Sequence, residues 1–127
     1  MNVKILKTQL PENPQAVIFV NGIKARNLKG WLYMWRNLNQ FRSSPKQISG
    51  LVDIKAGIIS PAELVIVSYW ETAEALTEYF KSEPHRKMMK HFYYHIDDLE
   101  LYNETYSPSQ GGKYNAQHGM AKLYPLA

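Results

Sequence analysis

The spacing of apolar residues changes several times along the chain, and each change predicts the border of an element. Four short segments are rich in β-branched and aromatic residues, which favours strands. They are residues 16–21, 48–58, 64–70 and 99–106. Between them, apolar residues recur every three or four positions, as they do on one face of a helix. Two such stretches cover residues 28–41 and 72–96.

Cap residues predict where these helices begin and end. Ser43-Ser44-Pro45 ends the first helix, and Thr72 is placed to cap the next. Ser82 followed by Pro84 predicts a fresh start, because serine is a good N-cap and proline is tolerated in the first turn. The second helical stretch is therefore expected to consist of two helices.

The order strand–helix–strand–strand–helix–strand predicts an α+β fold of the ferredoxin-like, split-βαβ type. Its four-stranded sheet carries helices on one face, so an apolar opposite face calls for a partner, usually a second copy in a symmetric homodimer. We expect residues 1–127 to form one domain. Pro11 and Pro14 discourage regular structure in an N-terminal arm over residues 1–14, and glycines predict a loop-rich tail over residues 107–127.

Composition removes several function classes. The chain has 127 residues and no cysteine, which excludes disulfides, thiolate zinc sites and a thiol nucleophile. No apolar run approaches the roughly 18 residues that cross a bilayer, so no membrane partner is expected. The first seven residues lack the apolar stretch of a secretory signal, and we expect a cytoplasmic protein. Walker A, GxGxxG and G-x-S-x-G motifs are missing, which argues against nucleotide cofactors and serine hydrolysis.

The net charge of +4 is unevenly distributed. Residues 13–52 contain no acidic side chain and six basic ones, namely Lys24, Arg26, Lys29, Arg36, Arg42 and Lys46. Such a stretch could attract an anionic ligand or nucleic acid, or it could be the solvated face of an amphipathic helix. Because no nucleic-acid-binding motif accompanies it, we expect no nucleic-acid partner.

Several short motifs occur in an order that resembles a known family. They are Tyr69-Trp70-Glu71-Thr72, Pro84-His85, Asn103-Glu104-Thr105-Tyr106 and Gly112-Lys113-Tyr114. Together they resemble a bacterial family related to the antibiotic-biosynthesis-monooxygenase-like, dimeric α/β-barrel proteins, over about residues 17–123. The resemblance implies a homodimeric α/β barrel and a cofactor-independent monooxygenase-like enzyme for a small aromatic or polyketide-like compound. The chain departs from the family at Met88 and Met89, where a tryptophan is expected.

His85 is the leading catalytic candidate. At helical spacing it lies in the middle of an apolar stripe with Met88, Met89 and Phe92. An imidazole in that position is either a hydrogen-bonded core group or a base in a cavity. The family that the chain resembles retains a histidine at this position, and we therefore regard the core and the base interpretations as equally well supported.

The other histidines carry less weight. His91 and His95 fall on the flank of the stripe, and their spacing of four has no third ligand beside it, so no metal site is predicted. His118 lies in the tail without a recognisable partner.

Asn21 is the second catalytic candidate, since it is a polar residue that ends an apolar strand. The resemblance implies that it hydrogen-bonds a substrate or intermediate, although polar strand ends are also ordinary. Trp31, Trp35 and Trp70 are predicted to bind substrate, because they suit a flat aromatic ligand; the alternative is that they belong to the core.

Glu104 and Tyr106 are also predicted to bind substrate. They share one face of the last strand by alternation, and Leu101, Asn103 and Thr105 share the other. The pattern leaves open which of the two faces lines the cavity.

Two further functions compete with the enzyme hypothesis. A non-catalytic small-ligand or interaction module would have the space around His85 filled by Met88, Phe92 and Trp35. Haem is a weaker cofactor candidate, because the resemblance places Met89 where haem-degrading relatives are expected to have an iron-binding histidine.

Overall fold

Four antiparallel strands form the main sheet of the computed structural model, which describes residues 4–127. They are β2 (Val17–Ala25), β3 (Leu51–Ser60), β4 (Glu63–Trp70) and β5 (Leu99–Tyr106), in the spatial order β3-β4-β2-β5. This strand order and the element order confirm the predicted ferredoxin-like α+β fold.

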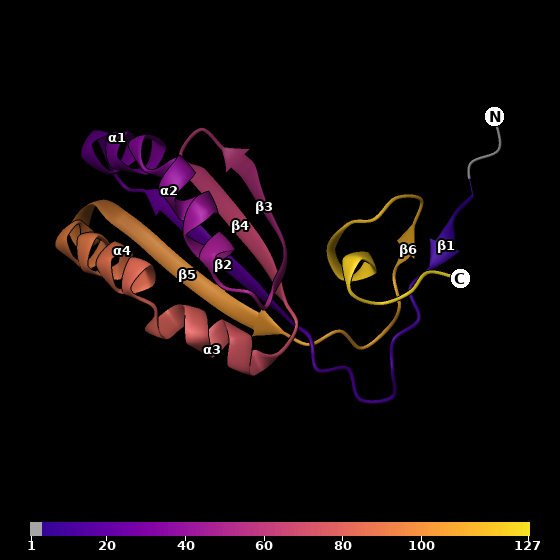
Figure 1. The fold of residues 1–127 in the computed structure, drawn as a ribbon. Coiled ribbons are helices and arrows are strands. Elements are labelled where there is room, and N and C mark those ends of the chain that lie inside the picture. Colours follow the sequence, from indigo (N-terminus) through magenta and orange to yellow (C-terminus); the bar gives the residue numbers. More distant parts are fainter. Residues whose placement is uncertain (1–3) are drawn as a thin grey trace.

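Four α-helices lie together on one side of this sheet, as Figure 1 shows. They are α1 (Leu28–Arg36), α2 (Leu38–Ser43), α3 (Ala73–Lys81) and α4 (Glu83–Tyr94). Short 3₁₀ segments η1 (Ser44–Gln47), η2 (Ile96–Asp98) and η3 (Gly119–Lys122) complete the helical structure. None of the helices within residues 4–127 is long and apolar enough to span a bilayer.

The predicted caps are confirmed, whereas the first helix is shorter than predicted. Thr72 Oγ1 accepts a hydrogen bond from the Ala75 amide at 3.1 Å, and Ser82 Oγ accepts one from the His85 amide at 3.4 Å. The helix predicted over residues 28–41 is interrupted at Asn37, whose Nδ2 donates to the Tyr33 carbonyl at 2.8 Å. A side chain that bonds its own backbone in this way competes with the helical hydrogen-bond pattern.

The first strand continues past its predicted end at residue 21. Gly22 makes this continuation possible, because the ring of Tyr102 on β5 lies directly over it. A Cβ at Gly22 would lie only 1.9 Å from that ring. The second strand begins at Leu51 rather than at residue 48.

The core lies between the sheet and the helices, in two clusters. One is centred under α1, α2 and α4 and consists of Ile23, Met34, Phe41, Leu64, Ile66, Met88, Phe92 and Leu99. The other lies under α3 and consists of Val17, Phe19, Trp70, Leu76 and Tyr79. The boundary between the two clusters is where a cavity opens.

The N-terminal arm and the C-terminal tail pair with each other, beside the main body in Figure 1. β1 (Leu6–Lys7) and β6 (Lys113–Tyr114) form a two-stranded antiparallel sheet. The arm is therefore more regular than Pro11 and Pro14 suggested; Met1–Val3 of the predicted arm lie outside the described residues.

Asp53 of β3 attaches the tail to the sheet. Its carboxylate accepts hydrogen bonds from the Gly119 amide at 2.8 Å and from Lys122 Nζ at 3.0 Å. Burial alone would raise the pKa of Asp53, but the hydrogen bonds from Gly119, Lys122 and Ile54 hold it below its ordinary value. Gly119 adopts a φ of +53° and lies against the ring of Tyr69, a position that an L side chain would not fit.

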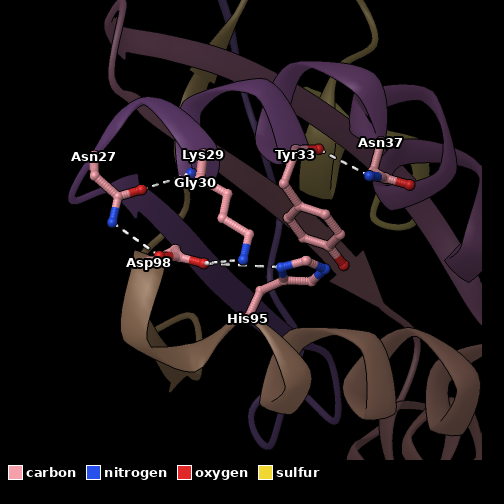
Figure 2. A network of polar contacts seen from close by, with 7 residues as sticks. All are labelled: Asn27, Lys29, Gly30, Tyr33, Asn37, His95 and Asp98. Atoms are coloured by element: carbon pink, nitrogen blue, oxygen red, sulfur yellow. Dashed lines mark hydrogen bonds and ion pairs between the residues drawn. The ribbon is translucent and has the colours of Figure 1, made fainter.

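A polar network connects the start of α1 to the end of α4 (Figure 2). Asn27 Oδ1 caps α1 by accepting from the Gly30 amide at 2.9 Å, while its Nδ2 donates to Asp98 Oδ1 at 2.8 Å. His95 Nδ1 lies 3.9 Å from Asp98 Oδ2, and the imidazole stacks on Tyr33 at a centroid distance of 4.3 Å. His95 is thus a boundary residue that joins two helices.

Candidate active site

A cavity of about 260 Å³ lies between the helices and the sheet, at the boundary of the two core clusters. Most of its wall is apolar, and seven elements contribute to it: β2, α2, η1, β4, α3, α4 and β5. The apolar lining residues are Phe19, Phe41, Pro45, Ile66, Phe80, Met89, Phe92 and Leu101. Its polar lining consists of Asn21, Ser68, Tyr79, His85 and Asn103. Mostly apolar walls with a few convergent polar groups are typical of small-molecule sites.

His85 lies in the first turn of α4 and lines this cavity. Its Nδ1 is 3.0 Å from the Phe80 carbonyl oxygen. Because a carbonyl oxygen only accepts, this contact places the ring proton on Nδ1 and leaves the lone pair on Nε2. Of the two interpretations left open for His85, a core group and a base in a cavity, its place in the cavity wall matches the second.

The surroundings of His85 favour its neutral form. Burial lowers the pKa of the imidazole, and the hydrogen bond to Phe80 only partly opposes this effect. The rings of Tyr79 and Phe80 lie 4.8 and 5.2 Å from the imidazole centroid. The positive end of the α4 dipole also disfavours a cation in the first turn. A neutral imidazole with a free lone pair is suited to accept a proton.

Asn21 and Asn103 occupy directly opposed positions on β2 and β5, and both line the cavity. Opposed cross-strand side chains lie close enough to act on the same ligand. Each carboxamide offers N–H donors and a carbonyl acceptor. Asn21 was predicted from its strand-end position, whereas Asn103 was not singled out, although it lies in one of the motifs of the resemblance.

Trp70 supports the cavity wall from behind. It is completely buried, its ring stacks on Tyr79 at 5.4 Å, and its Nε1 donates to Ser68 Oγ at 2.8 Å. Ser68 and Tyr79 line the cavity, but Trp70 does not. Trp70 was interpreted either as a substrate-binding residue or as a core residue, and its position matches the second interpretation.

Trp31 and Trp35 lie away from the cavity. Their Nε1 atoms both donate to the carbonyl oxygen of Pro61, at 2.8 and 3.0 Å. They thereby fasten α1 to the turn between β3 and β4. The helix segment that reaches the cavity is instead α2 with η1, through Phe41 and Pro45.

Glu104 and Tyr106 lie on the face of β5 that points away from the helices, outside this cavity. The alternation places Leu101 and Asn103 inside instead. The Tyr106 hydroxyl donates to the Glu104 carboxylate, and this hydrogen bond raises the pKa of Tyr106. Glu104 and Tyr106 are both exposed.

The space beside His85 is open. Met88 and Phe92 pack into the core and Trp35 packs against it, yet none of them fills the cavity, and only Phe92 contributes to its wall. The filled arrangement expected of a module without a ligand site is therefore not observed. Met89, which replaces the expected iron-binding histidine, lies in the cavity wall beside His85.

Comparison with known proteins gives one family match. The family model described as "Monooxygenase af470-like" matches residues 16–123. A search of the curated proteins found no match.

Solved structures share the fold at low sequence identity. SnoaB, a cofactor-independent oxygenase from Streptomyces nogalater, superimposes with a TM-score of 0.60 at 11% identity, over 76% of this chain and 95% of SnoaB. A candidate antibiotic biosynthesis monooxygenase from Deinococcus radiodurans gives 0.61 at 12%, over 73% and 93% of the two chains. Protein SO0527 from Shewanella oneidensis gives 0.60 at 14%, over 80% and 94%.

Proposed function

Because the chain belongs to the Monooxygenase af470-like family, we propose that it is a monooxygenase-like enzyme whose active site is the cavity beside His85. The observation that carries this proposal is the coincidence of an apolar cavity with a neutral imidazole in its wall, tied through Nδ1 to Phe80. The substrate we propose is a small aromatic or polyketide-like compound.

The size and lining of the cavity support an aromatic substrate. A dry cavity of about 150 Å³ lined by apolar side chains is large enough for benzene. The cavity of about 260 Å³ is therefore suited to roughly two fused rings. Phe19, Phe80 and Phe92 provide ring edges and faces for aromatic contacts.

We propose that His85 acts as the general base. Its Nε2 accepts a proton from an acidic hydroxyl or an activated C–H group of the substrate. Asn21 and Asn103 then donate N–H groups to the oxygen on which negative charge develops. The resulting electron-rich anion reacts with O₂. In the net reaction, a CH₂ group of the substrate and one O₂ give a carbonyl group and one water molecule. The proton that His85 abstracted is returned to the oxygen atom that leaves as water.

We propose that this reaction needs no bound cofactor. SnoaB, which shares the fold, is described as cofactor-independent. In the scheme above the substrate anion supplies the electrons that reduce O₂, so no other reductant is needed.

We further propose that two copies of the chain associate through the sheet. The face opposite the helices carries Ile18 and Val20 of β2 and Val67 of β4, which are only partly covered in one copy. An apolar sheet face without a helix layer favours a second layer, and a symmetric homodimer supplies it.

The catalytic proposal is tested by comparing His85→Gln with His91→Gln, an exposed histidine on the same helix. O₂ consumption is followed with a panel of hydroxylated naphthalenes and tetralones, which have two fused rings, as probe substrates. We expect His85→Gln to lower turnover by about 100-fold or more, the range of general-base catalysis, and His91→Gln to leave it unchanged.

Three outcomes would contradict the proposal. Equal rates for the two variants would remove His85 from the mechanism. Ligand-induced thermal stabilisation of the unmodified chain without O₂ consumption would favour a non-catalytic binding module. A Soret band on haemin titration that His85→Gln abolishes would favour haem binding.

A further inference from the structure

A second concave region lies on the other side of α2, and the function proposed above does not use it. The segment formed by α2 and η1 separates the two regions: Phe41 and Pro45 face the His85 cavity, while Arg42 and Lys46 face outward. α2 and β3 lie side by side in Figure 1, and the outward region runs between them. Its volume is about 630 Å³, and we call it the basic groove.

The charged residues of the basic groove are all of one sign. Arg42 of α2 and Lys46 of η1 come from the acid-free stretch of the sequence and line the helix side of the groove. Lys55 of β3 borders the groove, but it pairs with Val67, so its side chain lies on the opposite face of the sheet; His118 of the tail is a further lining residue. No acidic residue is among its lining residues within the described chain. Arg42 and Lys46 therefore supply the positive charge on the helix side of the groove.

These cations are not neutralised by neighbours. Within residues 4–127 the ion pairs involve Lys29, Lys87, His95 and Lys122, and none of the cations of the groove. The carboxylate closest along β3 is that of Asp53, which already accepts hydrogen bonds from Lys122 and Gly119. The positive potential of the groove is thus available to a ligand.

The floor of the basic groove is apolar. It consists of Leu38, Ile54, Ile58 and Leu64, and Ile58 is 64% exposed. Ile54 and Ile58 lie opposite Ser68 and Leu64 of β4, which places them on the helix side of the sheet. The apolar floor is therefore separate from the opposite face that we propose for the homodimer.

We infer that the basic groove binds an amphipathic organic anion, with the anionic group against Arg42 and Lys46 and an apolar body along Ile54 and Ile58. A simple inorganic anion would leave the apolar floor exposed to water, and an uncharged apolar molecule would leave the cations unpaired. Only a ligand with both parts matches both features.

The test uses decanoate as the probe and ¹⁵N-labelled full-length chain in 0.15 M NaCl. We expect saturable amide shifts in residues 38–46 and 54–58. Arg42→Gln with Lys46→Gln should weaken decanoate binding about tenfold, and Ile58→Ser should weaken it severalfold. The matched control, Lys29→Gln with Arg36→Gln, removes two cations of the same acid-free stretch outside the groove and should leave the affinity unchanged.

Two further binding measurements distinguish recognition of a free amphipathic anion from apolar binding alone and from binding to a membrane surface. Decanol, which lacks the charge, should bind at least about tenfold more weakly than decanoate. Vesicles of phosphatidylglycerol and phosphatidylcholine should not retain the chain on sedimentation.

The inference is overturned if decanol binds as well as decanoate, or if the groove variant and the control bind decanoate equally. It is also overturned if the amide shifts are confined to the residues around His85, or if the chain binds vesicles but not free decanoate. Because turnover is not measured, these outcomes are independent of the proposed oxygenase activity.

Discussion

At the scale of single residues, the protonation state of His85 decides whether the cavity contains a base. Burial holds its pKa below the ordinary value of 6.5, and only the neutral form has a lone pair on Nε2. We predict that kcat/KM of the proposed reaction falls as the pH drops through this lowered pKa, and that it reaches its plateau at a lower pH than it would with a histidine of ordinary pKa. The measurement is a pH–rate profile, combined with NMR titration of the histidine ring protons.

The same shift affects stability. In the unfolded chain His85 takes up its proton near 6.5, before the folded chain does, so the unfolding free energy decreases as the pH falls below 6.5 toward the lowered pKa. His85→Gln should remove this part of the pH dependence, as measured by urea unfolding at pH 7.5 and 5.5. A histidine titration at or above 6.5 would contradict both expectations.

Asp53 gives a second prediction at this scale. Its side chain is 8% exposed and bonds Gly119 and Lys122. Because its pKa is lowered, its stabilising contribution is present above the ordinary 3.8 and is lost as the pH falls through the lowered value. We expect Asp53→Asn to release the tail and to reduce the unfolding free energy at pH 7 by about 1–3 kcal/mol.

Limited proteolysis of the tail and urea unfolding measure this effect, with Asp97→Asn as the exposed control. Equal cleavage rates for both variants would show that Asp53 does not hold the tail.

Some residues of the candidate site could be predicted from the sequence, and others could not. The apolar stripe around His85 placed it on the helix face that meets the sheet, but the stripe alone did not decide between a core group and a base in a cavity. Asn103 could not be separated from Glu104, because alternation gives two faces without saying which is inside. Trp31 and Trp35 showed core-like spacing, but no sequence signal indicated that both would bond Pro61.

At the scale of elements, Asn27 has two roles in one side chain. It caps α1 through Gly30 and connects α1 to the α4–β5 junction through Asp98. We predict that Asn27→Ala reduces the unfolding free energy by about 1–2 kcal/mol, because it removes the cap and leaves Asp98 without this donor. Urea unfolding measures the change, and Asn39→Ala, at an exposed position of α2, is the control. A loss no larger than that of the control would contradict the double role.

Element borders were predictable where a cap residue marks them. Thr72 and Ser82 cap their helices as predicted, because both signals are local. The break at Asn37 accompanies a side-chain hydrogen bond to the Tyr33 carbonyl, which is local but has no apolar signature. The continuation of β2 to Ala25 involves pairing with β5, a distant segment, where Gly22 leaves room for the ring of Tyr102. Apolar periodicity alone does not contain this information.

At the scale of the whole molecule, the element order was enough to predict the fold, since few arrangements accommodate βαββαβ with right-handed crossovers. The pairing of arm and tail was not predictable in the same way. It joins two-residue strands more than a hundred positions apart, at Leu6–Lys7 and Lys113–Tyr114. Strands this short have no periodicity to detect.

The homodimer is the prediction that belongs to the whole molecule. One chain has a mass of 14.7 kDa, so light scattering after size exclusion should give about twice this value at micromolar concentration. Val67→Lys places a charge on the sheet face that carries Ile18 and Val20, and burying that charge without a partner is costly. We therefore expect Val67→Lys to yield monomers, whereas Thr77→Lys, on the exposed surface of α3, should leave the dimer intact. A monomeric unmodified chain, or a Val67→Lys variant that remains folded and dimeric, would mean that another element covers this face. The His85 cavity lies on the opposite side of the sheet, so its ligand affinity should be the same in Val67→Lys monomers as in the dimer.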